Sequence, residues 1–193
     1  DVDVLEKKLP TRLKGTFIEV LNFLRFGFKF NYFKKAFNYL FSNNNYFDSY
    51  IELIKFEKEK NLKPIYFLNP GRFFNNFKSI FVEPTYNLDE FLTSRLVNLL
   101  KKNNFDIGLH PSYFSWNNFE IILSQKSRIE KKFNIKITQS RQHWLRFSIF
   151  KTISNIEKAG ILFDFSYGFN DKYGFRNGSC LKIIPWNFNN KSL

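Results

Sequence analysis

The chain contains two histidines, His110 and His143, and each follows a short apolar run of the kind that forms a β-strand. Asp1 and Asp3 flank Val2, so both carboxylates point to the same face of an extended segment. The carboxyl ends of parallel strands meet at one edge of a sheet, where sites are built. Two imidazoles and a carboxylate there form the ligand set of an open zinc centre, and a second carboxylate can accept a proton. The residues therefore predict a hydrolytic metal site, with structural histidines and solvated aspartates as the alternative.

Further polar residues lie near the expected strand ends. Arg141 precedes His143 by two residues and shares its face in an extended chain, where it can orient a carboxylate or stabilise an oxyanion. Asp164, at the end of the next expected strand, can pair with Arg141, and Arg176 in a glycine-bearing loop can contact an anion or a substrate. A structural ion pair is the alternative for each of them. Ser112 offers a hydroxyl, but not in the G-x-S-x-G turn of a serine hydrolase.

Alternating helices and strands must position these residues. The pattern predicts helices at 50–60, 89–102, 118–133 and 149–158, and strands at 64–68, 105–109, 135–143 and 161–164. This order is typical of right-handed βαβ units and of a parallel α/β sheet or barrel. Before it, the sequence predicts a strand at the start of the chain and a loop over 4–15. A helical insertion of about 16–45 follows, as two helices broken around Gly27, and residues 72–87 are expected to form an aromatic loop.

Composition limits the class of protein. A chain of 193 residues with 44% hydrophobic residues is sufficient for one domain with its own core. No charge-free stretch is long enough to cross a membrane, so no transmembrane segment is expected. The single cysteine, Cys180, excludes an intramolecular disulfide and a multi-cysteine zinc site and favours a cytoplasmic location. Because the chain begins at Asp1 in what resembles a strand end and contains no Met, we expect it to be a fragment.

The formal net charge of +13 raises the question of an anionic partner. The lysines are spread over the whole chain, and Lys, Asn, Phe and Ile are abundant together, which is typical of biased coding composition. We therefore expect no nucleic-acid partner. The basic, phenylalanine-rich stretch at 16–41 fits a membrane surface or packing against its own domain, and the second is the more common outcome.

Four motifs follow one another at the expected strand ends. They are Asp1-Val-Asp3, Gly108-Leu-His-Pro-Ser112, Arg141-Gln-His-Trp-Leu-Arg146 and Gly174-Phe-Arg-Asn-Gly178. Together they resemble the polysaccharide deacetylase family, also called the NodB-homology domain, and most of all a divergent bacterial branch with D-x-D, G-L-H-x-S and R-Q-H-x-L-R motifs. The resemblance spans nearly the whole chain. It implies one domain over residues 1–193, folded as an incomplete (β/α)7 barrel, and a divalent metal, usually zinc.

The resemblance also implies an activity, which is the hydrolysis of an N-acetyl amide on a carbohydrate or of a related C–N bond. Asp1 matches the general base, and Asp3 and His110 match metal ligands. Arg141 matches the arginine of the third motif and, with Asp164, completes the catalytic candidates. The expected contacts to the N-acetylated substrate come from four side chains: Ser112, Tyr86, Trp144 and Arg176.

Three departures from the family pattern keep other interpretations open. Phe114 stands where a second metal histidine is usual, so His143 must replace it as a ligand. Val2 separates two aspartates that are usually adjacent, and no histidine follows His143 to serve as a late catalytic acid. The alternatives are a domain of the same fold that binds carbohydrate or acts as a scaffold without catalysis, and a basic surface-binding protein.

Overall fold

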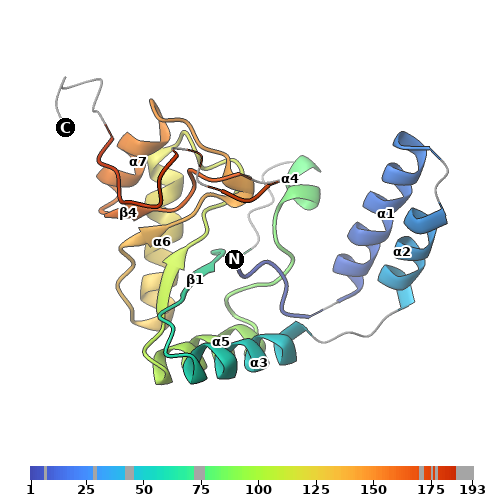
Figure 1. Ribbon diagram of the computed structural model, residues 1–193, viewed down its shortest axis with the longest axis horizontal. Coiled ribbons are helices and arrows are strands. Elements are labelled where there is room, and N and C mark those ends of the chain that lie inside the picture. Colours follow the sequence, from blue (N-terminus) through green and yellow to red (C-terminus); the bar gives the residue numbers. More distant parts are fainter. Residues whose placement is uncertain are drawn as a thin grey trace.

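The computed structural model describes residues 1–6, 8–27, 30–41, 46–71, 77–169, 172–174, 176 and 178–185. Its centre is a parallel sheet with the strand order β1-β2-β3-β4 (Figure 1). The strands are Ile65–Leu68, Asp106–Leu109, Gln139–Ser140 and Phe163–Asp164. The expectation of a parallel α/β sheet is confirmed, and no pairing among the described residues closes this sheet into a barrel.

Helices alternate with these strands. They are α3 (Tyr46–Glu59), α4 (Phe77–Val82), α5 (Phe91–Lys102), α6 (Phe119–Phe133) and α7 (Thr152–Lys158). Helix α3 packs beside α5, α6 packs beside α7, and both α5 and α6 contact β2. Figure 1 shows these helices around the sheet, with α1 (Leu9–Arg25) and α2 (Phe30–Phe41) standing to one side. Within the described part of the chain, no helix has both the length and the apolar character needed to cross a membrane.

Helix α6 illustrates why the sequence folds in this way. It begins after Asn118, whose side-chain oxygen accepts a hydrogen bond of 3.1 Å from the Ile121 amide and so caps an otherwise unpaired N–H group. It ends at Asn134, which has the left-handed φ of 49° that closes many helices. Ile122 and Ile129 face the core between these ends. Both termini are therefore specified locally, and the apolar positions choose the buried face.

The N-terminal part differs from the expectation. The predicted loop over 4–15 is wrong from Leu9 onward, because α1 begins there. Pro10 lies in the first turn, where a helix has no acceptor for the N–H group that proline lacks. The break near Gly27 is confirmed, since this glycine has a left-handed φ of 82° between α1 and α2. Likewise, α4 occupies part of the segment predicted as an aromatic loop, of which residues 72–76 lie outside the described residues.

The strands before the site are shorter than expected. The strand around Val2 consists of one parallel bridge to Leu68. The strand predicted over 135–143 is reduced to β3, because the chain turns into a 3-10 helix at His143–Leu145. The register nevertheless aligns five residues in one row across the sheet: Val2, Leu68, Leu109, Ser140 and Asp164.

Candidate metal centre

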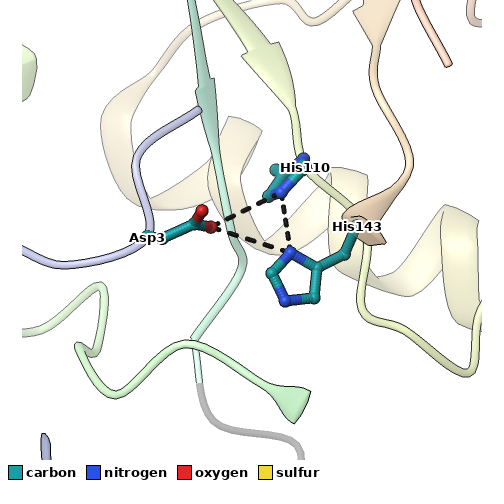
Figure 2. Close-up of side chains that lie close together, drawn as sticks. All are labelled: Asp3, His110 and His143. Carbon is teal, nitrogen blue, oxygen red and sulfur yellow. Dashed lines mark hydrogen bonds and ion pairs between the residues drawn. The ribbon is translucent and has the colours of Figure 1, made fainter. Parts of the chain in front are cut away.

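Three side chains meet at the carboxyl edge of the sheet. Asp3 follows the bridge at Val2, His110 follows β2, and His143 lies three residues after β3. One ligand atom from each residue lies within 4.8 Å of the other two. Figure 2 shows the three side chains pointing toward one another. The parallel register therefore brings together residues that are far apart in the sequence, as their positions at the strand ends predict.

The distances among the three ligand atoms are those of a small triangle. His110 Nε2 is 3.5 Å from Asp3 Oδ1, His143 Nδ1 is 3.7 Å from the same oxygen, and the two ring nitrogens are 2.8 Å apart. The circle through three points with these separations has a radius of about 2.0 Å, the length of a zinc bond to nitrogen or oxygen. One position thus lies at bonding distance from all three atoms.

Two backbone carbonyls determine which ring nitrogen of each histidine carries the proton. His110 Nδ1 donates to the Arg141 carbonyl at 2.5 Å, and His143 Nε2 donates to the Val82 carbonyl at 2.6 Å. A carbonyl only accepts, so in the neutral rings His110 Nε2 and His143 Nδ1 hold lone pairs. These are the two nitrogens that face each other at 2.8 Å. Two neutral rings cannot hydrogen-bond there, and a cation between them removes the repulsion.

The Asp3 carboxylate supplies the third donor atom. Its side chain is 50% exposed, yet Oδ1 is buried and has no hydrogen-bond partner. Burial raises the pKa of this carboxyl, but the contact with His110 and the positive charge that His110, His143 and the α-amino group carry when protonated outweigh burial and hold the pKa below its ordinary value. A buried, ionised oxygen without a donor is costly unless a cation neutralises it. The donor set of two imidazole nitrogens and one carboxylate oxygen fits Zn²⁺.

His143 is held in the neutral form that binds metal. Burial, with a further contribution from His110, lowers the pKa of His143 to about 4. The ring also packs edge-on against His110, with centroids 4.7 Å apart. The next residue, Trp144, has a left-handed φ of 59° and donates its Nε1 proton to the Val82 carbonyl at 3.3 Å. This strained turn fixes the orientation of the His143 ring.

Asp1 and Arg141 lie beside the three-ligand cluster. Arg141 Nε is 3.3 Å from Asp1 Oδ2, and Asp1 Oδ1 is 3.9 Å from His110 Nδ1. Both carboxylates approach His110, Asp1 at Nδ1 and Asp3 at Nε2. Arg141 thus holds a carboxylate next to the candidate ligands and turns the other oxygen of Asp1 toward His110.

Asp164 has a different environment from the one expected. Its Oδ2 accepts hydrogen bonds from the hydroxyls of Ser140 and Ser166 at 2.7 and 3.0 Å, and its Oδ1 accepts from the Ser166 amide at 2.9 Å. Burial raises the pKa of Asp164, against these hydrogen bonds and the charge of Arg141. Arg141 forms its ion pair with Asp1, and Asp164 instead links the ends of β3 and β4 through the Ser140 hydroxyl.

The four residues expected to contact the substrate differ in how exposed they are and in what they contact. Trp144 is 59% exposed and lies beside His143, with ring centroids 6.3 Å apart. Ser112 is buried, and its hydroxyl accepts from Gln125 at 2.7 Å. Tyr86 is 3% exposed and its hydroxyl bonds to the Asn69 backbone, so it belongs to the core instead of a substrate groove. Arg176 is exposed, with its guanidinium 5.2 Å from the Tyr167 ring centroid.

Sequence reasoning missed Glu83, which directly follows α4. Its side chain is almost fully buried, Oε1 accepts from the Tyr113 amide at 2.9 Å, and Oε2 has no partner. Burial raises the pKa of Glu83 to about 7. Glu83 lines a cavity of 230 Å³ together with Ser112 and Phe114. No periodicity marks this glutamate, because it lies between an unpredicted short helix and a loop.

Lys14 is the second residue that the sequence did not single out. It extends from α1 and donates from Nζ to the Glu83 carbonyl at 2.8 Å. Burial lowers the pKa of its ammonium group, against the attraction of Glu83 and Asp3. The segment predicted as a loop therefore contributes a positive charge near the cluster. Only the helical character of residues 9–25 places it there.

Comparison with known protein-family models, with curated proteins and with solved structures gives no match for this chain.

Proposed function

We propose that the protein is a metal-dependent hydrolase of C–N bonds that removes N-acetyl groups from a carbohydrate, on a divergent fold of the NodB type. The observation that carries this proposal is the pair of lone-pair nitrogens of His110 and His143, facing each other beside the unpartnered oxygen of Asp3. Such a donor set is complete only with a cation. The four ordered motifs support the choice of amide hydrolysis among the reactions that a three-ligand centre can perform.

Asp3, His110 and His143 would hold a divalent ion, with Zn²⁺ the best fit to their donor atoms. When bound, the ion supplies a Lewis acid that polarises the acetyl carbonyl and increases the acidity of water. The neutral state of His143, with its pKa lowered to about 4, keeps its Nδ1 available at neutral pH. The carbonyls of Arg141 and Val82 orient both rings, as the outer partners of metal-binding histidines do.

Asp1 is the candidate general base of the reaction. Arg141 holds one of its oxygens at 3.3 Å, while the other oxygen lies 3.9 Å from His110 Nδ1, the ring nitrogen that does not face the cluster. We assign to this carboxylate the proton of the attacking water. Arg141 is thus a positioning residue, and its guanidinium also offers positive charge to a developing oxyanion.

Glu83 is the candidate general acid, a role for which no histidine is present after His143. Burial raises its pKa to about 7, so the protonated carboxyl is accessible near neutral pH. The unpartnered Oε2 lies in a residue that lines the 230 Å³ cavity with Ser112. We assign to this proton the role of protonating the leaving amine. Trp144, exposed beside His143, offers an indole face for a sugar ring.

The test has two readouts, zinc content and acetate release. The protein is stripped with a chelator, reloaded with Zn²⁺ and analysed for bound metal and for acetate released from N-acetylated oligosaccharides. We expect one zinc per chain, loss of both zinc and activity in His110→Ala, and retained zinc with lost activity in Glu83→Gln.

Two outcomes would contradict the proposal. Zinc content near zero in the reloaded wild type would favour a scaffold domain without a metal. One zinc per chain without acetate release from any N-acetylated sugar would leave a metal site and remove the hydrolase. Full activity in Glu83→Gln would dismiss only the acid role.

A further inference from the structure

Helices α1 and α2, which we call the α1–α2 hairpin, carry apolar stripes that face solvent. On α1 the exposed positions recur with helical spacing, and they are Leu9, Leu13, Phe17, Val20 and Leu24. A helix of a soluble domain normally turns such a stripe toward the core. In this hairpin the stripe stays largely outside, and among its described residues only Phe17 makes a ring contact with the body, so the pattern points to another contact.

Helix α2 has the same arrangement with larger side chains. Phe30, Phe33, Phe37 and Phe41 lie along one face and are 57% to 77% exposed. The rings form two contacting pairs, with centroids 6.3 Å apart for Phe30 and Phe33 and 4.5 Å apart for Phe37 and Phe41. An exposed row of four aromatic side chains is uncommon on a monomeric protein and marks an interaction surface.

The two helices pack through small residues, and this leaves the apolar stripes outside. A Cβ atom on Gly15 would overlap the Tyr39 ring, so the close approach of α1 to α2 requires glycine there. Thr16 donates its hydroxyl proton to the Ala36 carbonyl at 3.3 Å, and Ala36 is buried in the contact. The face between the helices is thus already filled, and the phenylalanines are not needed to hold the hairpin together.

The charge of the hairpin indicates what the stripes meet. Between Leu9 and Phe41 the sequence has six Lys or Arg residues and one acidic residue, Glu19. Lys34 and Lys35 are exposed next to the aromatic row of α2. Apolar stripes with flanking basic residues are the pattern of helices that lie in the interface of an anionic bilayer. A two-fold contact between copies would instead place the two basic surfaces against each other, which is unfavourable.

The hairpin is also fixed to the body near the candidate metal centre. Phe17 packs on Phe81 of α4 with centroids 5.3 Å apart, and the Thr11 and Thr85 hydroxyls hydrogen-bond at 2.6 Å. Lys14 bonds to the Glu83 carbonyl. These contacts anchor α1, while α2 stands on its outer side, away from the sheet (Figure 1).

We infer that the α1–α2 hairpin docks on the surface of an anionic lipid bilayer, with the exposed phenylalanines in the headgroup region and the basic residues against lipid phosphates. This inference is independent of the hydrolase proposal, because it rests on the exposed phenylalanines of α2 and on Lys34 and Lys35, which do not belong to the ligand cluster. It adds a location at which the chain acts and assigns the excess positive charge of this segment to a partner.

Vesicle co-sedimentation of the whole chain tests the inference. The probes are phosphatidylcholine vesicles with and without about a quarter of phosphatidylserine. We expect the wild type to bind the anionic vesicles about tenfold or more tightly than the neutral ones, with binding weakened by salt. The variants Phe33→Ser/Phe37→Ser and Lys34→Glu/Lys35→Glu should each lose about tenfold or more of this affinity.

Matched controls separate docking from general stickiness and from misfolding. Phe91→Ser/Leu162→Ser removes apolar groups elsewhere that are even more exposed than Phe33 and Phe37, and Lys55→Glu/Lys58→Glu makes the same charge change on α3. Both should bind like the wild type, and all variants should melt within a few degrees of it. Equal binding by hairpin and control variants, or no binding by the wild type, would overturn the inference. So would a light-scattering dimer that Phe33→Ser/Phe37→Ser abolishes without any vesicle binding, because the occupant would then be a second copy.

Discussion

At the scale of single residues, the candidate site depends on how each histidine is oriented by the backbone. The Arg141 carbonyl fixes the proton of His110 on Nδ1, and the Val82 carbonyl fixes the proton of His143 on Nε2. One ring would therefore bind through Nε2 and the other through Nδ1. A cation at this position meets ligands whose rotation and tautomer are already set, so little conformational entropy is lost on binding.

A substitution at Asp3, the candidate carboxylate ligand, gives the most direct test of metal binding. Asp3→Asn keeps the size of the side chain but removes its charge, so we expect zinc affinity to fall about 100-fold or more. Asp89→Asn is the matched control, because Asp89 forms surface ion pairs with Lys132 and Arg128 far along the chain from the cluster. Isothermal titration with Zn²⁺ measures both. Equal affinities in the two variants would exclude Asp3 as a ligand.

Glu83 predicts a pH dependence of stability. Its pKa is raised from 4.5 to about 7 on folding, so the folded state holds the proton more tightly than the unfolded state. This tighter proton binding stabilises the folded state fully below pH 4.5. The stabilisation, and with it the free energy of unfolding, decreases as the pH rises toward 7. The loss is about 3 kcal/mol, and Glu83→Gln should abolish it.

Urea denaturation in chelator at pH 4.5 and pH 7.5 measures this difference. Glu120→Gln, on the exposed side of α6, serves as the control and should retain the wild-type pH dependence. If Glu83→Gln and the wild type lose the same stability between the two pH values, the Glu83 carboxyl is not buried as described.

The site residues that could be predicted from the sequence lie at strand ends, and those that could not are placed by the packing of helices. Asp3, His110 and His143 were predictable, because each follows an apolar run and parallel strands end at one edge. Glu83 and Lys14 were not, since their positions depend on how α4 and α1 pack, and no local pattern encodes that packing. Helical spacing also says nothing about whether a stripe faces a core or a solvent.

At the scale of elements, the approach of β1 and β2 requires a glycine. Gly108 pairs with Phe67, and a Cβ atom on Gly108 would lie 2.5 Å from the Phe67 ring and 3.2 Å from the Gln139 carbonyl. Contacts so short force the ring or the strand to move. The residue two positions before His110 therefore sets the spacing of the strands that deliver the ligands.

Gly108→Ala should destabilise the protein by about 1–3 kcal/mol, because the Phe67 ring must leave its position against Phe165. The control is Gly168→Ala, where an added Cβ would meet only Leu145 at 3.5 Å and the backbone has no left-handed φ. Guanidinium denaturation of both variants measures the difference. Equal stability of the two would show that the Phe67 ring has room to move.

The lengths of some elements could not be predicted from the sequence, and β3 shows why. The apolar alternation of Ile135 and Ile137 predicted a strand that continues to His143. Strand pairing ends at Ser140, because the chain then turns, with positive φ at Trp144 and Leu145. Neither residue type favours that conformation, so the turn follows from tertiary contacts such as those to the Val82 carbonyl.

At the scale of the whole molecule, the positive charges have different neighbours in the hairpin and in the rest of the chain. The net charge of +13 is spread along the chain, but in the hairpin it accompanies exposed phenylalanines. The body instead pairs many of its charges, as in the contacts of Lys132 with Asp89 and Lys126 with Glu130. The molecule therefore has two surfaces of different character, one around the candidate centre and one on the hairpin.

The lone bridge between Val2 and Leu68 has a dynamic consequence. This bridge and the 2.9 Å hydrogen bond from the Val2 amide to the Phe67 carbonyl secure the segment that contains Asp1 and Asp3. We expect a single bridge to open more often than a paired strand, so the Val2 amide should exchange with solvent deuterium faster than the amides inside β1. A metal ion bound by Asp3 would hold this segment in place. Zinc should therefore slow the hydrogen exchange of the Val2 amide far more than that of the Phe67 amide, as measured by nuclear magnetic resonance. Unchanged hydrogen exchange of the Val2 amide in zinc-loaded protein would mean that metal binding does not stabilise this segment.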